Sequence, residues 1–412
     1  MSLKHDRDVI VAGAGPAGAI AALTLARAGR RVLVVERYAL PRQKPCGGGI
    51  STRLLTRFPW LGEPLDRIPT HPVSSLYLEG PSGAVFRMRS DGPAVVLIRR
   101  IEFDYLLVSL AKEAGAEILA PAAIAQASQD AHGVTLRTRD GRELHAPVVI
   151  AADGVNSVIA RRLGMNPGWA PERLALDMME ETPVSSLRTA EPDTLSVFYG
   201  YGGAHGYAYI FPKRGHVNVG IGYVLPYFKQ RVDLTPYDLQ QQFVGELRSR
   251  GMMDGDSQRE HFTPFLIPIG GPLSRTASGR VLLAGDAGGF VNGFSAEGIY
   301  YAMVTGELAA KAVLEARSPA QMRRAYVRAW RHEIGAELRD SVLIQKYLFN
   351  SPERMDRVVS GANARPEFSR ILVDYASGRL SYRAARRRLL WHFPRLLPRL
   401  ARIAFHRQAA SV

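Results

Sequence analysis

The chain has 412 residues, of which 46% are hydrophobic and 22% charged, as in ordinary soluble globular proteins. This length allows two or three packed units. Cys46 is the only cysteine, which excludes an intramolecular disulfide and any multi-cysteine zinc or iron–sulfur site, and we expect no metal. No apolar signal core precedes the first expected strand, and no segment reads as a transmembrane span. We therefore predict a cytoplasmic protein.

The net charge of +15 is concentrated in the last quarter of the chain. Residues 1–316 hold 33 Lys and Arg against 31 Asp and Glu, whereas residues 317–412 hold 20 against 7. A nearly neutral body thus carries a strongly basic tail. Anionic membrane surfaces and nucleic acids would both attract such a tail.

The segment 8–36 predicts a strand, a glycine-rich turn, a helix and a second strand. Its apolar runs at 9–12 and 32–35 are typical of buried parallel strands, and 19–28 is a small-residue helix. The turn between them contains the G-x-G-x-x-G pattern of Gly13, Gly15 and Gly18. These glycines permit a tight turn, close approach of a pyrophosphate and close helix packing, while Glu36 is placed to bind a ribose. The segment predicts a dinucleotide site.

The next segment, 37–51, is expected to be a loop because Pro41, Pro45 and the glycines 47–49 interrupt regular structure. Without side chains, these glycines allow the backbone to lie against a planar ring. A lone cysteine is by default an inert small hydrophobe. The position of Cys46 beside the glycines and Lys44 also suits an active-site thiol.

Strands and one helix are expected over residues 62–165. Short apolar runs at 74–78, 85–88 and 95–98 predict antiparallel strands of another sheet, and a helix follows from Phe103. Further strands are expected at 118–124, 133–139 and 144–151. The last ends in ADGVNS, where Asp153 either forms a simple turn or contacts a phosphate or ribose.

An aromatic strand is expected within the β-rich residues 166–271. Tyr207, Tyr209 and Phe211 alternate and therefore share one strand face, and Pro212 is expected to stop the strand. Such a row forms either sheet core or a cavity wall.

Residues 280–316 predict a return to the dinucleotide domain. A strand at 280–284 leads into Gly285, which allows a close turn, and Asp286, which can bind a polyol. A helix over 299–316 then presents its positive N-terminus to a ligand. Three separate cofactor-type segments favour FAD over NAD.

The chain is expected to be helical from residue 319. The stretch 386–408 interleaves arginines with Leu, Trp and Phe. It is either a helix docked on the body or an interfacial segment on an anionic membrane, and we favour the membrane. We expect no nucleic acid, because no recognisable nucleic-acid module is present.

Several motifs together resemble the geranylgeranyl reductase family of FAD-dependent oxidoreductases, which has the p-hydroxybenzoate-hydroxylase-like fold. They are GAGPAG (13–18), KPCGGGIS (44–51), R-x-x-F-D (100–104), ADGVNS (152–157), YAYIFPKRGHVNVGIG (207–222) and GDAGGFVNGFSAEGIYYAM (285–303). The resemblance covers roughly residues 8–310. It implies an α/β fold with a Rossmann-type FAD-binding domain of the glutathione-reductase kind, interrupted by an antiparallel β-sheet substrate domain and followed by helices. The expected segments are 1–61, 96–165 and 272–318 for FAD, 62–95 and 166–271 for substrate, and 319–412 for the basic helical region.

The resemblance also implies site residues. Those expected to bind FAD are Gly13, Gly15, Pro16, Ala17, Gly18, Glu36, Arg37, Cys46, Gly47, Gly48, Arg100, Asp153, Gly285, Asp286, Gly298 and Ile299. Those expected to contact substrate are Tyr207, Tyr209, Phe211, Pro212 and Gly293. The chain departs from the family pattern with Ala204 and Gly293 in place of prolines and Tyr209 in place of tryptophan. These departures put the identity of the substrate in question.

The activity implied by the resemblance is reduction of carbon–carbon double bonds in an isoprenoid chain. Reduced flavin N5 would give the hydride, and a nearby acid the proton, with Cys46, Tyr207 and Tyr209 as the catalytic candidates and Cys46 and Tyr207 flanking the substrate. The expected partners are a hydrophobic isoprenoid or lipid substrate and, through the basic C-terminal region, an anionic membrane surface on which the protein would be peripheral. We expect a monomer whose electron donor is NAD(P)H or ferredoxin. One alternative is a flavin monooxygenase or halogenase, although the W-x-W-x-I-P segment of halogenases is missing. The other is a non-catalytic membrane-associated flavoprotein.

Overall fold

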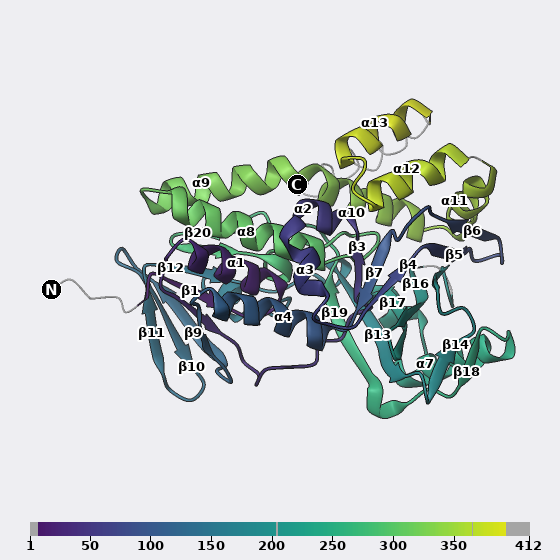
Figure 1. The fold of residues 1–412 in the computed structure, drawn as a ribbon, viewed down its shortest axis with the longest axis horizontal. Helices are drawn as coiled ribbons and strands as arrows, with labels where there is room; N and C mark the ends of the chain where they lie inside the picture. The colour runs from purple at the N-terminus through teal and green to yellow at the C-terminus, as the bar shows by residue number, and fades with distance from the viewer. Residues whose placement is uncertain (1–6, 203–204, 365, 393–412) are drawn as a thin grey trace. The chain divides into compact units, whose positions relative to one another are not determined.

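The computed structural model describes residues 7–202, 205–364 and 366–392 (Figure 1). It divides into two compact units. Unit 1 is built from segments 1–44, 101–174 and 267–341, and unit 2 from segments 45–100, 175–266 and 342–412. Each unit is discontinuous in sequence.

These boundaries differ from the expected ones at several places, since residues 166–174 and 267–271 also lie in unit 1. Segments 45–61 and 96–100 lie in unit 2, because β3 (Gly49–Ser51) pairs with β7 (Val95–Ile98) in a sheet of that unit. The expected helical region 319–412 is split at residue 341. Helix α9 (Pro319–Trp330) stays with unit 1, where Tyr326 donates a hydrogen bond to the carbonyl oxygen of Leu283 at 2.6 Å.

A six-stranded sheet forms the centre of unit 1, and its buried, mostly β-branched strands confirm the strands predicted at 9–12 and 32–35. All pairs are parallel except that of the edge strand β20. In spatial order the strands are β20 (Ala277–Ser278), β21 (Val281–Leu283), β12 (Val148–Ala151), β1 (Val9–Ala12), β2 (Val32–Val35) and β8 (Glu117–Leu119).

The helices of unit 1 include α1 (Pro16–Arg27) and α8 (Ile299–Glu315), which lie side by side (Figure 1). A Cβ on Gly306 of α8 would stand 2.9 Å from the carbonyl carbon of Ala17. The two backbones therefore touch, which only small residues allow. The remaining helices of this unit are α4 (Arg100–Glu113), which begins at the unit boundary, α5 (Val158–Arg162), η2 (Pro171–Arg173), η4 (Gly285–Gly288), α9 and the π-helical η5 (Arg331–Gly335).

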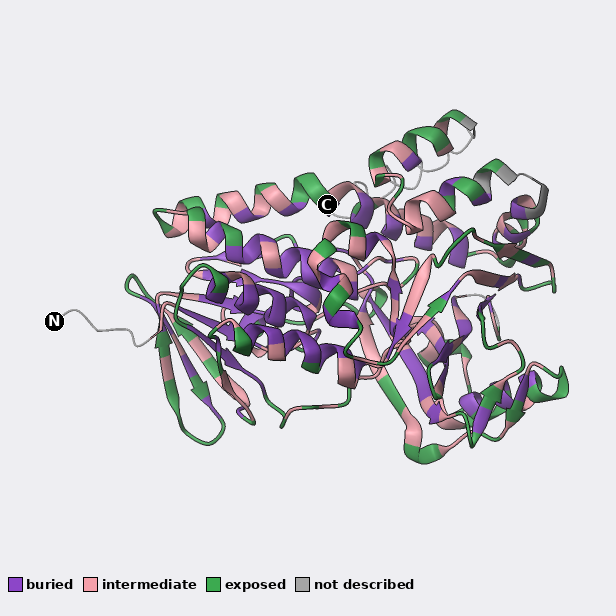
Figure 2. Cartoon of the chain, in the orientation of Figure 1, coloured by how far each residue is buried: buried purple, intermediate pink, exposed green. Residues whose placement is uncertain are grey.

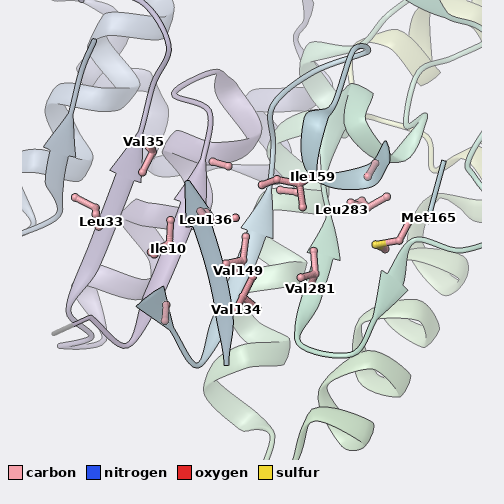
Figure 3. Packing of buried hydrophobic residues seen from close by; sticks show 14 of the residues in the cluster. Ile10, Leu33, Val35, Val134, Leu136, Val149, Ile159, Met165, Val281 and Leu283 are labelled. Carbon is pink, nitrogen blue, oxygen red and sulfur yellow. The ribbon is translucent and has the colours of Figure 1, made fainter. Parts of the chain in front are cut away.

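An antiparallel three-stranded sheet covers the main sheet through one apolar cluster, shown close up in Figure 3. Its strands are β9 (Ile124–Gln129), β10 (Val134–Thr138) and β11 (Glu143–Ala146). The single strand predicted at 144–151 is therefore wrong. Pro147 has no N–H to continue the ladder, so the chain leaves one sheet at Ala146 and enters the other at Val148.

The main sheet of unit 2 has seven strands and is mixed, because β5 runs parallel to β15 while the other recorded pairs are antiparallel. In spatial order they are β19 (Phe262–Pro268), β13 (Leu174–Pro183), β17 (His216–Val224), β16 (Gly206–Lys213), β15 (Thr194–Tyr199), β5 (Ser75–Glu79) and β6 (Val85–Arg89). One face is closed by α7 (Pro236–Ser249), whose Leu239, Phe243, Val244 and Leu247 join the core. The central strands β13, β17, β16 and β15 are mostly buried (Figure 2).

Smaller elements complete unit 2. They are β4 (Thr70–Val73), which with β3 and β7 forms a three-stranded sheet, the pair β14 (Leu187–Thr189) and β18 (Met253–Gly255), and the helices α2 (Arg53–Arg57), η1 (Pro59–Leu61), α3 (Gly62–Leu65), α6 (Leu225–Arg231) and η3 (Arg259–His261). The C-terminal helices are α10 (Ala336–Phe349), which crosses the unit boundary, α11 (Pro352–Ala364), α12 (Pro366–Ala376) and α13 (Tyr382–His392). None of the helices described is both long and apolar enough to cross a bilayer.

Candidate active site

The glycine-rich turn after β1 makes backbone contacts that exclude side chains. Gly13 has φ +99°, and a Cβ there would stand 2.8 Å from the carbonyl carbon of Ala152 at the end of β12. A Cβ on Gly18 would stand 3.0 Å from the carbonyl carbon of Gly13 and overlap its oxygen. The turn, α1 and β12 are thus held together by backbone contact.

The start of α1 leaves room for an anionic group. Gly15 is the N-cap residue, with Pro16 and Ala17 in the first turn, and no side chain caps the helix. A Cβ on Gly15 would meet only the guanidinium of Arg42, at 3.6 Å. Uncapped N–H groups beside open space fit a dinucleotide pyrophosphate.

Glu36 lies beside this turn and is 4% exposed. Its carboxylate accepts hydrogen bonds from the N–H groups of Ala14 at 2.9 Å and Tyr38 at 3.1 Å. Arg42 forms ion pairs with both Glu36, at 3.3 Å, and the buried Asp104, at 3.1 Å. A carboxylate held in this way keeps lone pairs for ribose hydroxyls.

Arg42 and Asp104 were missed by the sequence interpretation, which named Arg37. Arg37 stacks over the ring of Tyr38, with its guanidinium carbon 4.8 Å from the ring centroid. Asp104 could have been identified from the sequence, because it is the final residue of the R-x-x-F-D motif.

The segment after β21 meets the glycine-rich turn in unit 1. A Cβ on Gly285 would stand 3.1 Å from the Cβ of Ala17 and 3.4 Å from that of Ala302. Asp286 lies at the start of α8, since a Cβ on the N-cap residue Gly298 would be 3.6 Å from its Oδ1. Ile299 begins that helix, which has no side-chain cap. Segments distant in sequence thus form one surface with two uncapped helix N-termini.

Asp153 has both a structural contact and an unfilled one. Its Oδ2 accepts hydrogen bonds from the N–H groups of Val158 at 2.9 Å and Ile159 at 3.3 Å and so caps α5. Burial raises the pKa of this carboxyl. Within the described residues its Oδ1 is buried and has no hydrogen-bond partner, as expected of a group that awaits a ligand.

In unit 2, the loop around Cys46 is tied to the sheet by an ionic cluster. The N–H of Gly48 donates to the Cys46 Sγ at 3.3 Å, and the Lys213 ammonium to the Cys46 carbonyl oxygen at 3.4 Å. Glu181 joins Lys213, at 2.6 Å, to Arg99, at 2.7 Å. Burial alone would raise the pKa of Glu181, but the charge of Lys213 and the hydrogen bonds from both cations outweigh it and lower this pKa.

The aromatic row on β16 lies against this loop. A Cβ on Gly47 would be 2.7 Å from the Phe211 ring and 3.6 Å from that of Tyr209. The rings of Tyr209 and Phe211 are 4.6 Å apart, and those of Tyr207 and Tyr209 are 6.2 Å apart. Tyr199 and Phe349 extend the row, at 6.1 and 6.4 Å from the Tyr207 ring. The predicted aromatic face and the Cys46 loop are therefore brought together.

Tyr209 forms a contact that the sequence did not indicate. Its hydroxyl donates to Asp177 on β13, at 3.3 Å from Oδ1 and 3.4 Å from Oδ2. Burial and then the charge of Asp177 raise the pKa of Tyr209 well above its usual value. The same causes raise the pKa of Tyr207.

Other predicted residues lie elsewhere. Pro212 does not stop β16 but lies within it, opposite Val217, since pairing with β15 is recorded only as far as Ile210. It alternates onto the face opposite the aromatic row, so we drop it from the substrate-contacting set. In unit 1, Gly293 donates its N–H to the Ser341 Oγ at 2.9 Å. Arg100 begins α4 and is buried, and Ala204 and residues 393–412 lie outside the described residues.

Comparisons with known proteins give a consistent assignment. Residues 6–304 match the FAD binding domain family. Digeranylgeranylglycerophospholipid reductase 2 of Methanothermobacter thermautotrophicus is 31% identical, covering 90% of this chain and 97% of its own. Menaquinone reductase of Mycobacterium tuberculosis is 32% identical, covering 78% and 80%.

A solved structure shows the same fold. A geranylgeranyl bacteriochlorophyll reductase-like protein of Thermoplasma acidophilum superimposes with a TM-score of 0.79 at 22% identity, covering 96% of this chain and 99% of that one. The family match, the coverage of the relatives and the residues that fit FAD agree. The chain is therefore a member of the geranylgeranyl reductase family of FAD-dependent oxidoreductases.

Proposed function

We propose that this oxidoreductase saturates isolated carbon–carbon double bonds in the isoprenoid chain of a lipid. The observation that carries the proposal is the aromatic row of β16 beside the Cys46 loop. The names of the relatives indicate two substrate classes, a geranylgeranyl lipid and a quinone with an isoprenoid tail.

The substrate-binding surface would be the apolar side of the seven-stranded sheet. An apolar cluster adjoins the row there, made of Val73, Leu97, Leu195 and Val197 with Leu76, Leu78, Val95, Tyr199, Tyr207 and Phe211. Burial of a hydrocarbon stabilises binding by about 0.8 kcal/mol per CH₂ group. Such a surface binds a chain that carries no polar groups and excludes water from it.

Cys46 is the proton donor that this geometry favours. An isolated double bond is not electrophilic, so a proton must accompany or precede the hydride that bound, reduced FAD supplies. The Gly48 N–H donates to the Cys46 Sγ and leaves the thiol proton for another acceptor. The Tyr209 proton is directed to Asp177 instead. Tyr207 stays a second candidate, although its raised pKa makes it the weaker acid.

Product mass tests the proposal. Holoenzyme with a reductant and a geranylgeranyl lipid should give products heavier by ~2 Da per event, whereas oxygenation would add ~16 Da. Cys46→Ala should retain FAD and lose most alkene reduction, by about 10²-fold or more. Full activity in both Cys46→Ala and Tyr207→Phe would refute the assignment of the acid.

Two other activities remain distinct outcomes of this experiment. A monooxygenase or halogenase would give an oxygenated or halogenated product. A non-catalytic flavoprotein would bind FAD and show no substrate-dependent flavin reoxidation.

We propose an anionic membrane surface as a partner beyond the substrate, contacted by basic residues of α9 in unit 1 and, considered by itself, of α13 in unit 2. On α9, Met322, Tyr326 and Trp330 are buried, whereas Arg324, Arg328 and the adjoining Arg317 and Arg331 are exposed along the other side. On α13, the exposed Trp391 follows three consecutive arginines. Arginine attracts anionic headgroups, and tryptophan suits the interface.

Vesicle flotation tests membrane binding through α9. The protein should bind phosphatidylglycerol vesicles and not phosphatidylcholine vesicles, with binding lost in high salt. Arg324→Gln with Arg328→Gln should weaken binding, whereas Arg137→Gln, which removes a cation paired with Glu143, should not. We further propose a monomer, reduced by either NAD(P)H or ferredoxin. Anaerobic bleaching of the flavin by each donor separates the two.

A further inference from the structure

One row of residues across the seven-stranded sheet joins a buried carboxylate to the aromatic row. Asp177 on β13 lies opposite Gly222 on β17, which lies opposite Tyr207 on β16 and then Tyr199 on β15. The neighbouring row is Met179, Gly220, Tyr209 and Val197. Strand alternation places all of these on the side away from α7.

Glycines on β17 open the path between the carboxylate and the tyrosine. A Cβ on Gly220 would stand 2.5 Å from both the Tyr209 Cζ and its hydroxyl oxygen, so the ring lies directly over this residue. A Cβ on Gly222 would be 3.9 Å from the Asp177 Oδ1. The Tyr209 side chain can therefore extend over Gly220 of β17, so that its hydroxyl reaches Asp177.

The pair is buried and its polarity is fixed. Asp177 is 6% exposed and Tyr209 4%. An ionised carboxylate only accepts hydrogen bonds, so the Tyr209 hydroxyl must donate. Ionisation of Asp177 therefore places negative charge at the Tyr209 hydroxyl, beside rings whose faces are also electron-rich.

This arrangement suits a reaction in which the substrate carbon becomes positively charged. When a proton adds to an isolated double bond, its π electrons form the new C–H bond and the other carbon becomes cationic. The hydride then fills that carbon, so the alkene gains two electrons that the flavin loses. Negative charge and aromatic faces stabilise the cationic stage.

We propose that Asp177 is a positioning residue that acts through Tyr209, holding negative potential beside the aromatic row to stabilise positive charge on the substrate carbon. This inference rests on the proposed function, since only isolated double bonds require a cationic stage. It also explains why Tyr209 is a poor choice for the proton donor. Its task is to hold the charge of Asp177 close to the row.

Binding of a charged analogue tests the inference without turnover. The probe is a branched long-chain tertiary amine, cationic at neutral pH, compared with the neutral alcohol of the same carbon skeleton, each titrated into oxidised holoenzyme. The wild-type protein should bind the amine about 10- to 100-fold more tightly, as expected for attraction between unit charges several ångströms apart at an effective dielectric of about 20. Asp177→Asn should reduce this ratio to near one. Tyr209→Phe should reduce it in part and, combined with Asp177→Asn, should add nothing further.

Glu180→Gln is the matched control. Glu180 is on the same strand, fully buried, but faces α7, where it accepts hydrogen bonds from Thr182 at 2.9 Å, Gln258 at 2.8 Å and Gln240 at 3.0 Å. This variant should lose thermal stability and keep the amine preference. An unchanged ratio in Asp177→Asn, or no preference in the wild-type protein, overturns the inference.

Turnover separates the inference from the proposed function. If the wild-type protein reduces isolated alkenes and Asp177→Asn lowers neither kcat nor the amine preference, only the inference fails. If the wild-type protein reduces no isolated alkene, the proposed function fails whatever the binding ratio.

Discussion

The glycine-rich turn of unit 1 and the aromatic face of unit 2 both depend on missing side chains, but for different reasons. At Gly13 and Gly18 the two nearest atoms are backbone atoms, of Ala152 and of Gly13 respectively. At Gly220 they belong to the ring of Tyr209 and the side chain of Met179. Backbone cannot move aside without unfolding, whereas a ring can rotate at a smaller cost.

Backbone contacts in one region and side-chain contacts in the other indicate different roles for the two regions. The turn specifies a fixed shape for a cofactor common to many flavoproteins. The aromatic face is adjustable, since its shape depends on which side chains stand over which glycines. Four substitutions test this contrast.

Gly18→Ala should have the largest effect. The added methyl would overlap the carbonyl oxygen of Gly13, and neither α1 nor the turn can yield. We expect a loss of about 3 kcal/mol or more in the free energy of unfolding and loss of bound FAD. Flavin absorbance per protein and thermal denaturation measure both. Normal flavin content would show that the turn is as adjustable as the aromatic face.

Glu181→Gln should follow, because the Cys46 loop is held by charge and not by backbone contact. The variant leaves Lys213 and Arg99 without their shared carboxylate, at a cost of about 2–3 kcal/mol at neutral pH. The pKa of Glu181 is lowered from 4.5 in the folded protein, so its contribution is present above that value and lost as the pH falls through the folded pKa. The difference from wild type, measured by urea denaturation, should therefore shrink below about pH 4.

The surface pair of Arg87 with Glu191 is the matched control for that experiment. Both side chains are about half exposed. Glu191→Gln should cost less than about 1 kcal/mol. Equal losses in the two variants would show that the ionic cluster does not hold the loop.

Gly220→Ala should have a moderate effect that is confined to the aromatic face. The methyl would displace Tyr209 from Asp177 at a cost of about 1–3 kcal/mol, with FAD retained. Alkene reduction should fall about tenfold. Gly222→Ala, on the same strand and side, has no heavy atom closer than 3.9 Å and should be milder. The reverse ranking would contradict the packing of Tyr209 over Gly220.

Gly245→Ala should have the smallest effect and the opposite sign. This glycine lies within α7, on the closed side of the sheet, and a Cβ there meets nothing within 4 Å. Helix propensity then predicts a gain of about 0.5–1 kcal/mol, read as a higher Tm with unchanged activity. A loss would show that the closed face is less tolerant than its contacts indicate.

The sequence predicted features that depend on neighbouring residues and missed those that depend on strand register. The turn from Gly13 to Gly18 is local, and so is the alternation of Tyr207, Tyr209 and Phe211. Asp177 and Lys213 gain their partners only when β13, β17 and β16 align. No pattern along the chain reports that alignment.

Two prolines show the same limit of prediction from sequence, since the effect of one was underestimated and that of the other overestimated. Pro147 was included in one predicted strand, although it separates two strands of different sheets. Pro212 was expected to end a strand, but it is tolerated there because pairing on one side has already ended at Ile210. A missing N–H matters only where a partner strand would have used it.

The backbone contact between Ala17 and Gly306 has a consequence for biosynthesis. Helix α1 leaves the ribosome early, but its packing partner α8 is made only after most of the chain, and so is β21, which completes the sheet beside β12. Apolar strands and a nearly all-apolar helix must therefore wait unpaired during translation. Folding of unit 1 is thus a late event with high contact order, and nascent chains are exposed to aggregation until α8 is synthesised.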